Sequence, residues 1–449
     1  MTTNLEKLAE TILAPVGDAS GKLALHVLDT LGAWHAGTRV EEMGLLKAMT
    51  AASPGFAAIT PDTPLDRLAQ RVATVRATEI DDIHMESCTT VGSVIVPVAL
   101  TLAGVLGTAS AKTFAQSVAA GYEVMVRLGL AVSGATILYR GIWPTYFSGP
   151  IGAAATAAPL LGLNPAQTAN ALAIALASTC GALGGPSDSS PRFLVLGQAA
   201  RAGVFAALAA AKGYQADRTL LDGEWLQKTH GIALDTTPLL AVKAGDGAID
   251  AISYKPFCAA KQNTAAIDGF RQILAKVKAE DIASVKVKVP PSYAGMIGHK
   301  HAAKGRIERV SSTAYQFALC AYHPDMVEDV VRPNLSQEAP IAAFMAKVEV
   351  AADPDLAAYF PKTYPARVEA TLHNGEKITQ LVTDATGDPA RPLDAKDVIA
   401  KFHRLATPVA GKDIAARMEK AALGATTNDA SLKDLIAAIA TVPSLDVRS

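Results

Sequence analysis

Charged and aromatic side chains are scarce in this sequence. Charged residues make up 18% of its 449 residues and aromatic residues 5%. The formal net charge of −1 gives no electrostatic reason to expect nucleic acid or an anionic membrane surface as a partner. Hydrophobic residues make up 50%, a balance that suits closely packed helices rather than a disordered chain.

Cysteine is also rare, and no pair of cysteines has the spacing of a metal or redox motif. The four cysteines are Cys88, Cys180, Cys258 and Cys320. Their wide separation predicts buried thiols rather than a disulfide scaffold or a zinc site. The N-terminal segment carries Glu6, Lys7 and Glu10 where a signal peptide would need an apolar run. We therefore expect a cytoplasmic protein.

Two long stretches lack any formal charge, residues 87–111 and 141–187. The second is long enough for a membrane span. Prolines divide it into short pieces, and no Lys/Arg cluster flanks it in the manner of a membrane protein. Buried helices of a soluble protein are the better interpretation, so we expect no membrane partner.

Immediately before the first uncharged stretch lies a dense group of titratable residues, namely Glu79, Asp81, Asp82, His84 and Glu86. Such groups at the edge of an apolar interior have strongly shifted pKa values and are suited to acid–base chemistry. A solvated loop before a core helix is the alternative. A metal site is not predicted, because the cluster contains one histidine and has no distant histidine as a partner.

Periodic patterns predict helices over most of the first 262 residues, including 4–15, 21–37, 62–79 and 110–133. Asn164, Pro165 and Gln167 are typical of a helix start. Proline and glycine favour an irregular loop over residues 139–150. After residue 255, strands are predicted at 285–289, 347–351, 367–372 and 377–382, the last two joined as a hairpin. Helical patterns return after residue 394.

Arg192 follows Pro191 in the first turn of another predicted helix. Positive charge is disfavoured there because the exposed amides and the helix dipole attract anions. The position therefore indicates half of a carboxylate-binding site. An ion pair with Asp188 across the helix start is the alternative interpretation.

With these segments placed, the chain resembles the MmgE/PrpD family over nearly its whole length. The resemblance rests on LDTLG at 28–32, EIDDIH at 79–84, GYEVMVRL at 121–128, RGIWPT at 140–145, LGQAARAG at 196–203 and KPFC at 255–258 with AAID at 265–268. Their order and spacing together are specific.

The resemblance implies a mainly α fold, in which both chain ends build a large all-helical domain and a smaller α+β domain is inserted. We place the helical domain at 1–262, the α+β domain at 263–393 and the returning helices at 394–449. It further implies a site between the domains that needs no cofactor, a homodimer, and small di- or tricarboxylates as substrates. The shared chemistry moves a proton at the carbon beside a carboxylate, which requires a base and fixed cations.

Departures from the family pattern narrow the reaction. Thr90 and Val91 stand where dehydratase-like and decarboxylase-like members carry His-Pro, Trp143 replaces a further histidine, and Phe317 replaces a tyrosine. Expelling hydroxide needs a proton donor for the leaving group, so a 2-methylcitrate dehydratase is the less favoured alternative. An epimerase needs only one group on each face of the carbon. The sequence thus favours an epimerase or racemase of the iminodisuccinate type, with a non-catalytic carboxylate-binding protein as a second alternative.

We expect His84 or Lys255 to be the base and Tyr146 the opposing proton donor, with Asp81 or Asp82 orienting His84. The expected substrate-binding side chains are Arg140, Arg192, Lys261, Trp143 and Thr90.

Overall fold

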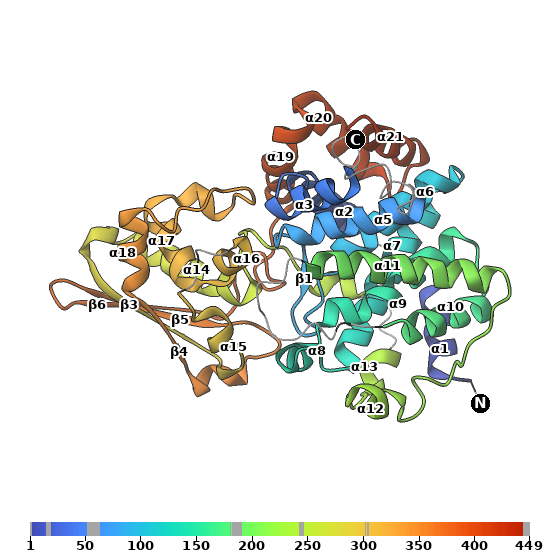
Figure 1. The fold of residues 1–449 in the computed structure, drawn as a ribbon, viewed down its shortest axis with the longest axis horizontal. Helices are drawn as coiled ribbons and strands as arrows, with labels where there is room; N and C mark the ends of the chain where they lie inside the picture. Colours follow the sequence, from blue (N-terminus) through green and yellow to red (C-terminus); the bar gives the residue numbers. More distant parts are fainter. Residues whose placement is uncertain are drawn as a thin grey trace. The chain divides into compact units, whose positions relative to one another are not determined.

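A computed structural model describes residues 2–14, 19–51, 63–179, 181, 191–241, 247–300, 302 and 305–442. The chain divides into two compact units. A helical unit is formed by the described residues of Met1–Gly185, Ser189–Ile252 and Asp394–Ser449, and an α+β unit by those of Ser253–Leu393. The protein is mainly α, as the sequence predicts (Figure 1).

The helical unit contains long helices and a few short turns. Its N-terminal part comprises α1 (Asn4–Ile12), α2 (Ser20–Gly37), α3 (Glu41–Ala51), α5 (Pro64–Ala77), β1 (Ile83–His84), α6 (Gly92–Leu106), α7 (Ala111–Ala131), α8 (Gly134–Ile137) and η1 (Leu138–Arg140). It continues through α9 (Pro144–Leu160), α10 (Pro165–Ala177), α11 (Pro191–Ala211), α12 (Trp225–His230), α13 (Thr236–Leu240) and η2 (Ala248–Ala251). The last segment comprises α19 (Ala395–Ala410), α20 (Lys412–Gly424) and α21 (Asp429–Ala440).

Helix α9 lies at the centre of this unit, where it packs against α6, α7, α10 and α11. Every residue from Pro144 to Ala158 is buried. The loop predicted over residues 139–150 is therefore wrong beyond Trp143. Pro144 occupies the first turn, where its missing N–H costs nothing, whereas Pro150 and Pro159 are accommodated inside the helix.

The C-terminal helices pack on the N-terminal ones. Helix α19 lies along α2, and α20 contacts both α19 and α2 (Figure 1). Both the beginning and the later part of the chain therefore build one core.

The α+β unit contains a four-stranded sheet in the order β4-β3-β5-β6. Its strands are β3 (Ile282–Val289), β4 (Val348–Ala352), β5 (Ala366–Leu372) and β6 (Lys377–Val382). Strand β4 pairs parallel to β3, whereas β5 and β6 form the predicted antiparallel hairpin. Helices of this unit are α14 (Lys261–Leu274), α15 (Pro291–Ile297), α16 (Arg306–Ser311), α17 (Thr313–Tyr322) and α18 (Ala339–Ala346), with short turns η3 (Ala279–Asp281), η4 (Pro324–Val327) and η5 (Pro354–Ala358).

The first boundary lies ten residues before the predicted one, within the short strand β2 (Ile252–Ser253). Backbone hydrogen bonds explain the difference, because the amides of Tyr254, Cys258 and Ala260 donate to carbonyls of residues 387, 327 and 310. Lys255 and Lys261 consequently belong to the α+β unit.

Candidate functional site

The titratable cluster singled out in the sequence forms a loop between α5 and α6 in the helical unit, and its titratable residues are buried except for the exposed Glu86. Glu79 and Cys88 adopt positive φ angles of 60° and 54°, a conformation that strains residues other than glycine. His84 and Thr89 exchange backbone hydrogen bonds of 2.9 and 3.2 Å across the loop. The loop is therefore closed on itself and holds a strained backbone at two positions.

Two arginines clamp the acidic end of this loop. Arg76, in the last turn of α5, donates to Glu79 at 2.9 Å and to Asp81 at 3.0 Å. Arg192, in the first turn of α11, pairs with the other oxygen of Glu79. All four side chains are buried. The neighbouring carboxylates hold the pKa of Arg76 above its ordinary value despite its burial, which opposes the charge.

Arg192 is thus paired with Glu79, and Asp188, the partner considered in the sequence, lies outside the described residues. Its guanidinium also lies 4.9 Å from the ring centroid of Trp143, a cation–π contact. The Nε atoms of Arg76 and Arg192 have no hydrogen-bond partner among the described residues. Each therefore keeps one buried donor that a ligand oxygen could satisfy.

Tyr146 lies beside this cluster at the start of α9. Its ring meets Trp143 edge-on, with 5.9 Å between the ring centroids. The side chain is fully buried, and its hydroxyl has no hydrogen-bond partner in the described part of the chain. Burial raises the pKa of Tyr146 to about 12, although the charges of Arg192 and Arg76 act to lower it. The phenol is therefore protonated at neutral pH and retains an unused donor.

Asp82 accepts hydrogen bonds from a different group of residues. One of its carboxylate oxygens accepts hydrogen bonds from His26 Nδ1 at 2.8 Å and from the Tyr122 hydroxyl at 2.6 Å. The other accepts from the amide of Gly92 at 2.7 Å, at the start of α6. Burial opposes ionisation of Asp82, but these donors together hold its pKa below the ordinary value. Asp82 therefore joins α2, α7 and α6 beneath the loop.

A second buried charge pair supports the same loop from the other end of the chain. Lys401 of α19 forms an ion pair of 2.6 Å with Asp29 of α2, and its ammonium group donates to the carbonyl of Ile80 at 2.8 Å. Burial raises the pKa of Asp29, and Lys401 acts in the opposite direction. Lys401 thereby ties the loop backbone to the helical core.

The predicted orientation of His84 by Asp81 or Asp82 is wrong. His84 Nδ1 instead accepts the Ser87 amide at 3.1 Å and contacts the Ser87 hydroxyl at 2.9 Å. Burial lowers the pKa of His84 to about 4, so the imidazole is neutral at neutral pH. Because Nδ1 is an acceptor, the proton resides on Nε2, and the ring is arranged to donate from that atom.

Thr90 joins the loop to the start of α9. Its amide donates to Thr145 Oγ1 at 2.9 Å, and the two hydroxyls lie 3.1 Å apart.

Arg140 is exposed, and its guanidinium donates to the carbonyl of Gly231 at 3.1 Å. Its role in substrate binding stays a prediction.

Lys255 and Lys261 are both buried in the α+β unit. Lys261, the first residue of α14, forms an ion pair with Asp388, which also accepts the amide of Ala385 at 2.9 Å. This ion pair neutralises the charge of Lys261, which was predicted to bind a substrate carboxylate. Among the described residues, no three His, Cys, Asp or Glu side chains are arranged to hold a metal ion.

Sequence reasoning missed Arg76 and Lys401. Arg76 could have been found from its spacing, since it precedes Glu79 and Asp81 by three and five residues. Lys401 gives no local signal, because its carbonyl partner is 321 residues away in the sequence.

The described residues contain one helix long and apolar enough to cross a membrane, Arg192–Ala211. More than half of its apolar window is buried within the protein, where it packs against α5, α9 and α10. The core helix of a soluble protein has the same character.

The fold and the cluster define a class: a mainly α protein that buries a tyrosine donor beside paired arginines and carboxylates. Residues 15–230 match the MmgE/PrpD N-terminal domain and residues 257–425 the MmgE/PrpD C-terminal domain. The chain therefore belongs to the MmgE/PrpD family.

Individual relatives are distant. The chain is 32% identical over 156 residues to a cis-aconitate decarboxylase of Aspergillus terreus, a match that covers 33% of this chain and 31% of that protein. A cis-aconitate decarboxylase-like protein of Aspergillus oryzae is 31% identical over 158 residues, or 33% and 32% of the two chains. These matches span about a third of the length of each relative.

Proposed function

We propose that this protein is a cofactor-independent epimerase or racemase, which removes and returns a proton at the carbon beside a carboxylate of a polycarboxylate such as iminodisuccinate. The observation that carries the proposal is the Tyr146 hydroxyl, a buried and protonated donor without a partner in the described residues, beside two arginines. Natural proteins seldom leave such a group unsatisfied unless a ligand or water completes it.

In this proposal one substrate carboxylate accepts the unused Nε donors of Arg76 and Arg192. When the neighbouring carbon loses its proton, negative charge develops on the carboxylate oxygens, and fixed cations stabilise that charge. Tyr146 then donates its proton to the opposite face of the carbon. The resulting phenolate is a base for the reverse direction, so both stereoisomers can be substrates.

For the base on the first face the sequence offers His84 or Lys255, and this choice stays a prediction. His84 is less suited, because the Ser87 amide occupies Nδ1 and places the proton on Nε2. His84 is better suited to donate a hydrogen bond to the substrate. Asp81 and Asp82 act indirectly, by fixing Arg76 and the loop.

Decarboxylation is a second candidate, and the similarity to the cis-aconitate decarboxylases favours it. Loss of carbon dioxide also leaves a carbanion beside a carboxylate, and Tyr146 could protonate it. A 2-methylcitrate dehydratase would in addition need a donor for the departing hydroxide, and Thr90 and Trp143 are not suited to that role. A protein that only binds carboxylates is the remaining possibility.

Proton NMR in deuterium oxide distinguishes these candidates. Purified protein is incubated separately with iminodisuccinate stereoisomers, 2-methylcitrate and cis-aconitate, with Tyr146→Phe as the matched variant. Loss of the α-proton signal of iminodisuccinate with a change of stereoisomer, strongly slowed in the variant, is the expected result. Release of carbon dioxide from cis-aconitate would establish the decarboxylase instead, and loss of water from 2-methylcitrate the dehydratase. Absence of exchange in every substrate would contradict catalysis on this class.

We also propose a cytoplasmic homodimer without nucleic-acid or membrane partners. The family resemblance supports the dimer. The absence of strong net charge supports the absence of nucleic-acid and membrane partners. Light scattering coupled to size exclusion tests it, since a dimer has twice the 46.5 kDa mass of the chain.

A further inference from the structure

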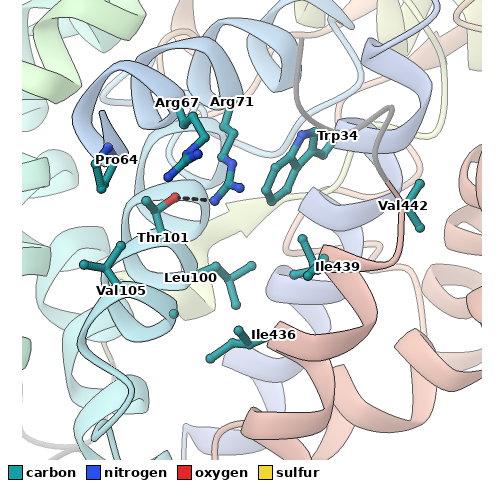
Figure 2. Close-up of a pocket in the computed structure, with 12 residues that line it drawn as sticks. Trp34, Pro64, Arg67, Arg71, Leu100, Thr101, Val105, Ile436, Ile439 and Val442 are labelled. Carbon is teal, nitrogen blue, oxygen red and sulfur yellow. Dashed lines mark hydrogen bonds between the residues drawn. The ribbon is translucent and has the colours of Figure 1, made fainter. Parts of the chain in front are cut away.

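A pocket of about 300 Å³ lies in the helical unit between α2, α5, α6 and α21 (Figure 2). Its volume is at the lower end of the range for small-molecule sites. The lining residues that matter here are Trp34, Arg67, Arg71, Leu100, Ile436 and Ile439. None of them belongs to the loop and arginine cluster described above, so this pocket is a separate feature.

One wall of the pocket carries positive charge. Arg67 and Arg71 lie one turn apart on α5, and both extend toward the pocket in Figure 2. Two like charges at this spacing repel each other along the helix. Arg71 is held in place, since it donates to Thr101 Oγ1 at 3.0 Å and its guanidinium lies 5.1 Å from the Trp34 ring centroid.

The opposite wall is aliphatic. Leu100 of α6 and Ile436 and Ile439 of α21 face the pocket across from the arginines (Figure 2). Leu100 and Ile439 are almost fully buried, with 3% and 7% exposure. A ligand that satisfies both walls must therefore have an anionic head and an apolar body.

We propose that this pocket binds a medium-chain carboxylic acid, with the carboxylate at Arg67 and Arg71 and the alkyl chain along Leu100, Ile436 and Ile439. Arginine suits a carboxylate because its planar donors match the two oxygens. The alkyl chain gains affinity from burial, by about fourfold for each methylene group removed from water.

Isothermal titration calorimetry of the protein tests the proposal with octanoate, octan-1-ol and hexanoate. Octanoate is expected to bind at one site, about tenfold or more tighter than octan-1-ol, which lacks the charged head. Hexanoate, two methylenes shorter, is expected to bind roughly fifteenfold more weakly than octanoate. Equal binding of octanoate and octan-1-ol would overturn the role of the arginines, and no binding of octanoate would overturn the site.

A substitution that fills the pocket locates the binding. Gly104 lies on the pocket wall, and a Cβ there would meet Ile436 at 3.4 Å, an ordinary contact. Gly104→Leu should therefore fold and abolish octanoate binding. Gly21→Leu is the matched control, because Gly21 is also helical and has no atom within 4 Å of its Cβ position. Unchanged binding by Gly104→Leu would overturn the proposal.

Arg67→Gln removes one charge from the wall and is expected to weaken octanoate binding by about tenfold. Unchanged binding in this variant would contradict the proposed position of the carboxylate. None of these measurements uses the proposed epimerase reaction, so the two proposals succeed or fail separately.

Discussion

Tyr146 and Tyr122 are two buried tyrosines of the helical unit that differ in the hydrogen bonding of their hydroxyl groups. The Tyr122 hydroxyl donates to Asp82 at 2.6 Å, whereas the Tyr146 hydroxyl has no partner in the described chain. A buried hydroxyl that contributes no hydrogen bond adds little to stability. Removing the Tyr146 hydroxyl therefore tests its proposed role with little disturbance of the fold.

The substitution Tyr146→Phe removes the hydroxyl and keeps the ring. We expect the free energy of unfolding, measured by urea titration, to change by less than about 1 kcal/mol. We expect α-proton exchange to slow by about a hundredfold or more, the usual effect of losing a general acid. Tyr122→Phe should show the reverse pattern, with a cost of about 1.5–3 kcal/mol for the lost bond to a carboxylate. Equal loss of stability in both variants would contradict this assignment.

Lys401 and Asp29 are a buried charge pair, with 2% and 1% exposure. Lys401→Met leaves Asp29 buried without its ammonium partner, which is expected to cost about 3–5 kcal/mol in the free energy of unfolding. Urea titration measures the loss, and the double variant Lys401→Met/Asp29→Asn should recover part of it, because neither charge then remains. A cost below about 1 kcal/mol would show that the pair is not needed.

Among the helices, α11 shows why a family motif has its glycines. The motif LGQAARAG contains Gly197 and Gly203 on this helix. A Cβ at Gly197 would lie 2.2 Å from the carbonyl oxygen of Ala69 on α5, and one at Gly203 would lie 2.0 Å from that of Pro150 on α9. The glycines therefore allow α11 to approach two neighbouring helices closely.

Gly203→Ala should force α11 and α9 apart. Overpacking of this kind usually costs about 1–3 kcal/mol, and thermal and urea unfolding both measure it. Gly21→Ala is the control, since its Cβ position is open and alanine favours a helix by about 0.5–1 kcal/mol over glycine. Stabilisation by Gly203→Ala would refute the close approach.

Local signals predicted most helices and strands. Asn164 and Gln167 form a capping box where a helix start was predicted, α7 follows its cap Ser110 within the predicted helix 110–133, and β5 and β6 form the expected hairpin. Helix α9 was missed because two interior prolines argue against a helix locally, whereas complete burial among four helices outweighs that preference.

The candidate site was predicted only in part. The acidic loop, Tyr146 and Arg192 were named as candidates because their residue types and spacing carry a local signal, and the structure brings them together. Their partners could not be assigned, because pairings such as Asp82 with His26 and Lys401 with Ile80 join distant parts of the sequence.

At the scale of the whole molecule, two buried histidines couple folding to pH. Burial lowers the pKa values of His35 and His84 to about 4 from 6.5. Both histidines bind protons more readily in the unfolded chain than in the folded one. Their contribution to stability is therefore complete above pH 6.5 and is lost as the pH falls toward 4.

Each histidine is expected to contribute up to about 3 kcal/mol to this loss. Urea titrations at several pH values between 7 and 4 measure the slope. In His35→Gln, which cannot titrate, the free energy of unfolding should fall less steeply over the same range. A parallel pH profile for the variant and the unmodified protein would contradict the assignment.

The bond from Lys401 to Ile80 also sets an order of events during synthesis. The two residues are 321 positions apart, and a ribosome adds about 5–20 residues per second. The loop at 79–91 must therefore wait roughly 16–60 s for the lysine that anchors it. Throughout that interval the backbone of Ile80 lacks the ammonium group that holds it in the folded protein.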